Sequence, residues 1–121
     1  MILLDTTIWL DHLRTSNPTL QDLLRSGRVL THPFVIGELA LGHLRRREVF
    51  LAELQRLPRA MMASDAEVLR LIEESGLVAS GIGYIDAHLL AATRLTLGST
   101  IWTGDKRLGK AAARLGLATT A

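Results

Sequence analysis

Short apolar runs alternate with helical segments along most of the chain, and this alternation is what most restricts its fold. Apolar runs at Ile2–Leu4, 28–31 and 99–103 have the character of strands. The segments between them carry apolar residues at helical spacing. Strands that alternate with helices predict a parallel sheet with helices packed against it. We therefore expect an α/β fold: a central parallel β-sheet flanked by helices on both faces.

Capping residues, glycines and prolines predict where these elements begin and end. Ser64 followed by Glu67 is the pattern of a capping box, which predicts a helix that begins at Asp65. A short edge strand is expected over 59–63, and a last strand over 117–120. No repeat and no Pro/Gly/Ser linker divides the chain, so we expect one domain over residues 1–121. The expected helices cover 6–13, the stretch between Asn17 and Gly27, 33–44, 48–57, 65–75, 84–97 and 105–115.

The composition is that of an ordinary globular protein. Of the 121 residues, 48% are hydrophobic and 21% are charged, and there is no cysteine. The lack of cysteine excludes disulfides, thiolate nucleophiles and zinc–thiolate sites. The apolar run at the N-terminus is too short for a signal peptide or a membrane span, so we expect a cytoplasmic protein without a membrane partner. The formal net charge of +2 says little about binding partners. All but two of the 14 basic residues are arginine, however, and the arginine side chain is well suited to binding phosphate.

Four acidic residues fall where this fold would bring them together. Asp5 and Asp105 each follow a predicted strand, and the carboxyl ends of parallel strands are where α/β sheets place their ligand sites. Glu38 lies within the helix after the second strand. Asp86 lies at the start of a helix among apolar residues, where an acid is badly placed unless a cation meets it.

Four carboxylates in one place would require a counter-ion. Two of them 5 Å apart repel by about 3 kcal/mol at an effective dielectric constant near 20. Mg²⁺ or Mn²⁺ would resolve this repulsion, because both ions prefer oxygen ligands and bind phosphate oxygens. Such an ion could activate a water molecule and neutralise charge while a P–O bond breaks. The hydroxyls of Thr6 and Thr103, beside the strand-end acids, could orient a carboxylate or a water.

Each acid also has a purely structural interpretation. Asp5 and Asp105 stand where helix N-caps are expected. Glu38 could be a solvated or salt-bridged helix residue. Asp86 is the hardest to explain in this way, because aspartate is a poor helix former and its neighbours are apolar. No single acid decides between the interpretations; their arrangement as a set is the more specific signal.

Four ordered motifs resemble those of the PIN-domain family, and within it the VapC toxins. The resemblance covers nearly the whole chain. The first motif is an apolar strand, an Asp and a hydroxyl residue; the second is a helix with Glu and, four residues on, Gly; the third is an Asp after a glycine loop; the fourth is Thr-x-Asp after a strand. The matching segments are ILLDTTIWLDHLR, THPFVIGELALGHLR, GIGYIDAHLLAA and IWTGDKRL.

This resemblance implies an endoribonuclease that depends on Mg²⁺ or Mn²⁺. The acidic quartet would be Asp5, Glu38, Asp86 and Asp105, and Thr103 would be the hydroxyl residue of the fourth motif. Some PIN nucleases carry a further acid shortly after the fourth one. Here the residues at 106–109 are Lys, Arg, Leu and Gly. We therefore expect one firmly held ion, with a second recruited by RNA.

The resemblance also implies partners. VapC relatives usually form homodimers and are inhibited by a small VapB-like antitoxin. Its C-terminal tail covers the toxin's active site, and its N-terminal part binds DNA. We accordingly expect a homodimer, a toxin–antitoxin hetero-oligomer and contact with DNA only through the antitoxin.

The remaining candidates are weaker. Lys106 and Arg107 adjoin Asp105 and are candidates for holding the RNA backbone, together with Thr6. His88 would point away from Asp86 on a helix, so a structural or surface role is favoured over catalysis. Trp9 and Trp102 are expected in the core. Arg45-Arg46-Arg47 is interpreted as a solvated helix end, with RNA contact as the alternative. The leucines of the first two helices exceed what one buried stripe needs, so part of them could form a groove for an antitoxin helix.

Two other function classes remain open. A phospho-aspartyl protein would require an acid pair or Asp-x-Asp at the first strand, where this chain has Asp5-Thr6-Thr7. A non-catalytic PIN-fold module that binds RNA or protein is the second alternative. The full acidic set argues against it, because a degraded relative would be expected to lose one or more acids.

Overall fold

Three short parallel strands form the centre of the molecule. The computed structural model describes residues 1–119. Its strands β1 (Ile2–Leu4), β2 (Val29–Leu30) and β3 (Thr100–Trp102) are arranged in the order β2-β1-β3. The register pairs Leu3 with Leu30 on one side and with Ile101 on the other. All three strands therefore end at the same edge of the sheet, as the alternating pattern predicts.

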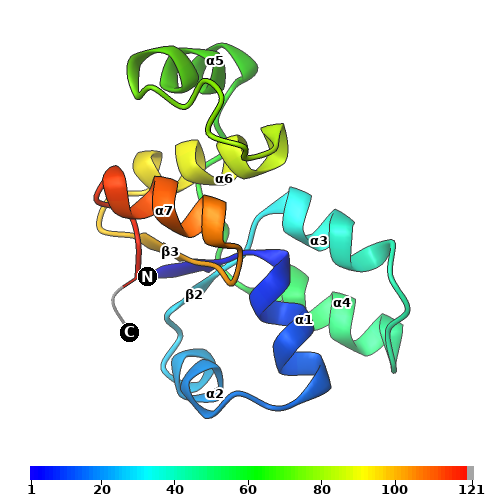
Figure 1. Cartoon of the computed structure of the whole chain (residues 1–121). Coiled ribbons are helices and arrows are strands. Elements are labelled where there is room, and N and C mark those ends of the chain that lie inside the picture. Colours follow the sequence, from blue (N-terminus) through cyan, green and yellow to red (C-terminus); the bar gives the residue numbers. More distant parts are fainter. Residues whose placement is uncertain (120–121) are drawn as a thin grey trace.

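Seven helices surround this sheet in the described part of the chain. Figure 1 shows α5, α6 and α7 on one side of the sheet and α1 and α2 on the other, with α3 and α4 beside α1. The α/β fold predicted from the sequence is confirmed. The bounds of the helices are α1 Thr6–Arg14, α2 Pro18–Arg25, α3 Pro33–Ala40, α4 Arg47–Arg56, α5 Asp65–Glu74, α6 Tyr84–Leu95 and α7 Lys106–Arg114.

The predicted strands over 59–63 and 117–120 are reduced to single bridges. One joins Thr31 to Arg59, and the other joins Ile101 to Ala118. Beyond the first bridge the Met61 N–H donates to the Thr96 hydroxyl at 2.8 Å, so the ladder cannot continue along that edge. The predicted strand over 117–120 was therefore too long, since among its described residues only Ala118 forms a bridge. Residue 120 of that prediction lies outside the described residues.

Local signals set most helix starts, whereas the third predicted helix was too long. Ser64 and Glu67 form the expected reciprocal capping box, with the Glu67 N–H donating to the Ser64 hydroxyl at 3.1 Å. Helix α3 ends at Ala40, before the predicted end at Leu44, because the Gly42 N–H donates to the Leu39 carbonyl and tightens the last turn. The chain then needs a left-handed residue, Arg46, to begin α4.

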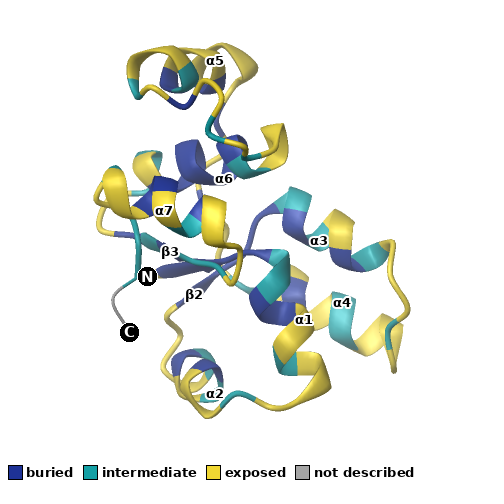
Figure 2. Cartoon of the chain, viewed as in Figure 1, coloured by how far each residue is buried: buried dark blue, intermediate teal, exposed yellow. Residues whose placement is uncertain are grey.

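The strands and helix α6 form the centre of the core, and the other helices pack their buried residues against them. Figure 2 shows the buried residues concentrated in the sheet and along α6. Leu3, Leu4 and Leu90 are completely buried, and α7 contributes the equally buried Leu108. Trp9 is buried as predicted, whereas Trp102 is half-buried and packs against the core from its edge. A core packed on both faces of such a small sheet fixes where its strands end, and so where the strand-end acids lie.

A buried histidine begins α3 and gives the stability of the protein a pH dependence. His32 is fully buried, and its Nδ1 accepts a hydrogen bond from the Phe34 N–H at 3.0 Å. Burial, the nearby His88 and Arg59 lower the pKa of His32 to about 4. The folded state therefore binds fewer protons than the unfolded state between this value and the ordinary pKa of 6.5.

We predict that the free energy of unfolding falls as the pH drops from about 6.5 towards 4, with a slope from His32 of up to about 1.4 kcal/mol per pH unit. His32→Asn keeps a capping acceptor but cannot titrate. The variant should be less stable at neutral pH and should lose less stability on acidification. Urea unfolding at a series of pH values measures both slopes; equal slopes would contradict the assignment.

Candidate active site

The starts of α1 and α7 meet at the carboxyl edge of the sheet. Asp5 follows β1 directly and caps α1, its Oδ1 accepting the Ile8 N–H at 3.3 Å. Asp105 follows β3 and caps α7, its Oδ1 accepting the Leu108 N–H at 2.9 Å. Both acids thus do what the structural interpretation expected of them. Capping leaves other lone pairs of each carboxylate free, so it does not exclude a second role.

Asp5 is a buried carboxylate held by two threonines. Only 4% of it is exposed. The Thr7 hydroxyl donates to Oδ1 at 2.5 Å, and the Thr103 hydroxyl donates to Oδ2. Charged groups are seldom buried without such partners, because an unpartnered buried charge is strongly destabilising. These hydrogen bonds hold the Asp5 carboxylate in one orientation.

The threonines also tie the fourth motif to the first. The Thr7 hydroxyl accepts the Gly104 N–H at 2.8 Å, and the Thr103 hydroxyl accepts the Asp105 N–H at 3.0 Å. Thr103 was selected from the sequence, whereas Thr7 was missed as a site residue. The only signal for Thr7 was its place two residues after Asp5, in the first turn of a helix.

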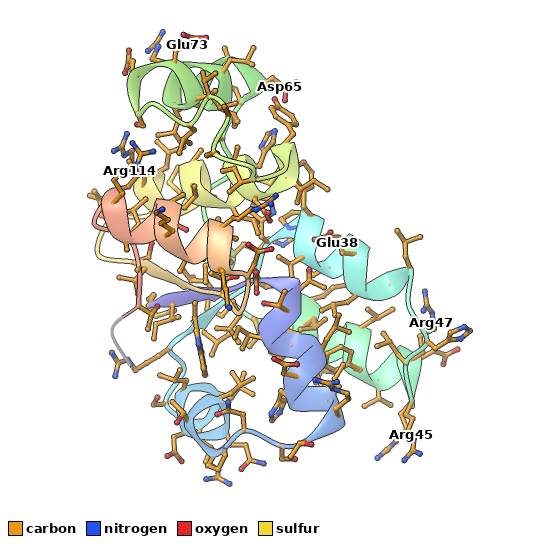
Figure 3. The ribbon with its side chains drawn as sticks, in the orientation of Figure 1. Glu38, Arg45, Arg47, Asp65, Glu73 and Arg114 are labelled. Carbon is orange, nitrogen blue, oxygen red and sulfur yellow. The ribbon has the colours of Figure 1, made fainter. Side chains whose placement is uncertain are left out.

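Glu38 reaches the site from a neighbouring helix. It is an exposed residue of α3, and the Thr6 hydroxyl donates to its Oε1 at 2.9 Å. Figure 3 shows Glu38 on α3, the helix that lies beside α1. The Thr6 hydroxyl, selected from the sequence as a substrate contact, here orients the Glu38 carboxylate.

The other three acids influence the pKa of Asp86. It lies in the first turn of α6 and is half-buried. Burial raises the pKa of Asp86, and the carboxylates of Asp105, Asp5 and Glu38 raise it further, against a hydrogen bond from the Gly83 backbone that lowers it. No basic side chain is among these causes. The four acids, named here the acidic cluster, therefore interact electrostatically, and none of them forms an ion pair with a basic side chain among the described residues.

The acidic cluster offers oxygen ligands for a hard divalent cation. Carboxylates and hydroxyls are the donors that Mg²⁺ and Mn²⁺ prefer. Within residues 1–119, however, no three carboxylate or imidazole groups converge on one point as they stand. Glu38 and Asp105 are both exposed, so solvent reaches their side chains. The donor chemistry and the uncompensated negative charge fit a divalent ion, whose binding would have to draw the carboxylates together.

The predicted basic residues lie next to the cluster. Lys106 and Arg107 form the first turn of α7 and are exposed. Neither makes an ion pair with another residue of the part of the chain that the structure describes. Their charges are available to a ligand.

His88 has the structural role that its position on α6 predicted. It is buried, and its Nε2 lies 3.3 Å from Oδ1 of Asp65 at the start of α5. The Tyr84 hydroxyl donates to the same oxygen at 3.0 Å. These contacts attach the first turn of α6, which carries Asp86, to the preceding helix.

A groove lies on another part of the surface, between α1, α2 and α4. Its lining is mostly apolar, and the indole Nε1 of the buried Trp9 has no hydrogen-bond partner among the described residues. Leu13 is 44% exposed here, whereas Leu20 and Leu23 turned out to belong to the core. Its lining residues are Trp9, His12, Leu13, Leu24, Phe50, Glu53, Leu54 and Leu57.

The helices of residues 1–119 are all too short or too polar to cross a membrane.

Comparison with known proteins agrees with the resemblance seen in the motifs. The profile of the PIN domain family matches residues 2–114. The chain is 42% identical over 118 residues to Ribonuclease VapC32 of Mycobacterium tuberculosis, in the strains CDC 1551 / Oshkosh and H37Rv. That alignment covers 98% of this chain and 95% of the relative. With a family match over nearly its whole length and this degree of identity to a VapC ribonuclease, the chain belongs to the PIN-domain family.

Proposed function

We propose that this protein is a metal-dependent endoribonuclease that acts as the toxin of a VapBC-type toxin–antitoxin pair. The observation that carries the proposal is geometric: the Thr103 hydroxyl connects Asp5 to Asp105 at the carboxyl edge of the sheet, and the Thr6 hydroxyl holds Glu38 beside them. The identity to Ribonuclease VapC32 supports RNA as the substrate. Cytoplasmic location, homodimerisation and a toxin–antitoxin hetero-oligomer remain predictions from the sequence.

In this proposal Asp5, Glu38, Asp86 and Asp105 hold a Mg²⁺ or Mn²⁺ ion. When bound, the ion would neutralise the repelling carboxylates and activate water for attack on a phosphodiester. Thr103 and Thr7 orient Asp5, and Thr6 orients Glu38. Outer partners of this kind matter because they fix the ligand before the ion arrives. Lys106 and Arg107 hold the RNA backbone next to the cluster.

Asp86→Asn should separate stability from activity. Removing one charge from the cluster relieves repulsion, so without metal at neutral pH the variant should be more stable than the parent. That advantage should shrink as the pH falls, because the raised pKa means that the parent's Asp86 becomes protonated early. RNA cleavage should fall by more than about 100-fold, since the loss of an outer partner alone costs about 10–100-fold. Thermal melts with and without Mn²⁺, together with cleavage rates, measure these effects.

Asp22→Asn is the matched control, because Asp22 is an acid on α2 whose exposed side chain pairs with Arg25. It should leave both the cleavage rate and the Mn²⁺-induced rise in melting temperature unchanged. Parental cleavage by Asp86→Asn would refute the proposed site.

Thr103→Val tests whether the orientation of Asp5 matters for catalysis. The variant keeps the shape of the side chain but removes the hydrogen bonds to Asp5 and from Asp105. We expect a loss of about 10–100-fold in kcat or in metal affinity. Thr103→Ser retains the hydroxyl and should restore most of the activity. Cleavage assays across a Mn²⁺ titration distinguish the two effects; a fully active Val variant would show that Thr103 has no such role.

The non-catalytic alternative makes a different prediction for metal binding. A module that only binds RNA or protein would need no ion. Calorimetry that detects no Mn²⁺ binding at millimolar metal would favour it over the nuclease. Membership of the PIN-domain family gives no support to the phospho-aspartyl alternative.

The antitoxin is proposed to place an amphipathic helix in the groove between α1, α2 and α4. Exposed apolar side chains such as Leu13 offer anchoring contacts, and Glu53 at the rim suits a basic residue. The unpartnered Trp9 N–H could donate to an acceptor on that helix. The groove lies apart from the acidic cluster, so binding there and inhibition at the active site can be tested separately.

Leu13→Arg should weaken inhibition by the cognate VapB-type antitoxin by at least about 10-fold, while RNA cleavage by the free protein stays unchanged. Leu97→Arg is the control, since Leu97 is 94% exposed and lies outside the groove. Residual cleavage during an antitoxin titration gives the measurement. Equal inhibition of the two variants would exclude this groove as the docking site.

A further inference from the structure

The side chain of Arg107 lies directly against the backbone of Gly81. Gly81 belongs to the loop between α5 and α6 and has a φ of +86°. A Cβ at this position would lie 2.9 Å from Cδ, 3.1 Å from Nη1 and 3.2 Å from Nε of Arg107. The left-handed backbone favours glycine here, and a Cβ would force the exposed side chain of Arg107 to move.

Arg114, at the other end of α7, shows what a structural arginine looks like in this region. Its Nη2 donates to the Gly76 carbonyl at 3.3 Å, in the same loop. Figure 3 shows Arg114 at the end of α7 that is away from the acidic cluster. Arg107 also contacts this loop, but its guanidinium makes no hydrogen bond or ion pair with the residues that the structure describes. The side chain of Arg107 therefore lies against Gly81, and its guanidinium donors are unused among the described residues.

The Gly81–Arg107 contact joins the two segments that carry Asp86 and Asp105. Arg107 follows Asp105 by two residues on α7, and the loop of Gly81 leads into the first turn of α6 with Asp86. A free, oriented guanidinium beside an acidic cluster is suited to a phosphate, which it can bind through two parallel N–H donors.

We propose that Gly81 is a positioning residue that holds Arg107 beside the acidic cluster, where its guanidinium binds a backbone phosphate of single-stranded RNA. The choice of RNA as ligand rests on the proposed function. Arg107 touches the phosphate; Gly81 acts only through Arg107. Since a phosphate contact is independent of base identity, it contributes affinity and register but no sequence preference.

The salt dependence of RNA binding measures this contact. Each phosphate that a cationic side chain neutralises in a single-stranded nucleic acid contributes about 0.7 to the slope of log affinity against log salt. Binding of a fluorescently labelled single-stranded RNA of mixed sequence is measured by anisotropy in EDTA over a series of KCl concentrations. Without divalent metal no cleavage interferes.

Arg107→Ala should lower the magnitude of the slope by about 0.7. Gly81→Ala should lower it by a similar amount because its Cβ displaces the arginine, and the double variant should lower it no further. Arg94→Ala and Gly98→Ala are the controls. Arg94 is an exposed arginine at the far end of α6, and Gly98 has a φ of +75° with open space where a Cβ would lie. Both controls should keep the parental slope.

Melting temperatures test the contact between Gly81 and Arg107 independently of RNA binding. Both glycine variants strain a left-handed residue, but only Gly81→Ala also meets Arg107. It should therefore lose more stability than Gly98→Ala, and adding Arg107→Ala should remove that excess. Additive losses in the double variant would overturn the positioning role.

Parental slopes in Arg107→Ala would overturn the phosphate contact. A parental slope in Gly81→Ala alone would overturn the role of Gly81. The proposed nuclease is judged by a separate measurement, cleavage of the same RNA after addition of Mn²⁺. Binding with the expected slopes but no cleavage would refute the nuclease and leave the Gly81–Arg107 inference in place.

Discussion

The buried carboxylate of Asp5 is the constraint on which the arrangement of the site depends. A buried charge is tolerated only when hydrogen bonds replace its lost water, and here Thr7, Thr103 and the Ile8 N–H supply them. Thr7 and Thr103 also accept backbone N–H groups of Gly104 and Asp105. Satisfying one carboxylate therefore fixes the start of α1, the end of β3 and the start of α7 relative to one another.

The same arrangement concentrates negative charge that the described residues do not neutralise. The pKa of Asp86 is raised as a result, because burial and the three neighbouring acids all disfavour its charged form. A fold selected only for stability would place a basic residue or an apolar residue there. Repulsion that persists without compensation is characteristic of sites whose missing charge comes from a ligand.

Residues outside the acidic cluster hold its helices in place. Asp65, at the start of α5, receives hydrogen-bonding contacts from Tyr84 and His88 and so holds the first turn of α6. His32 caps α3, the helix of Glu38, at the expense of a buried ring nitrogen without a partner among the described residues. Gly81 leaves the space in which the Arg107 side chain lies. Each of these residues contacts a helix or loop next to an acid or a cation of the site. A side chain on a well-held element is itself held in position.

The sequence by itself determined the alternation of strands and helices, the strand-end places of Asp5 and Asp105 and the capping box at Ser64, because periodicity and capping are local properties. Only the tertiary structure decided which edge pairs stop after one bridge, that Thr7 supports Asp5, and that Arg107 lies on Gly81. The hydrogen bonds Thr103–Asp5 and Gly104–Thr7 span 98 and 97 residues. Such contacts exist only because β1 and β3 are neighbours in the sheet, and no local pattern encodes which hydroxyl will face which carboxylate across them.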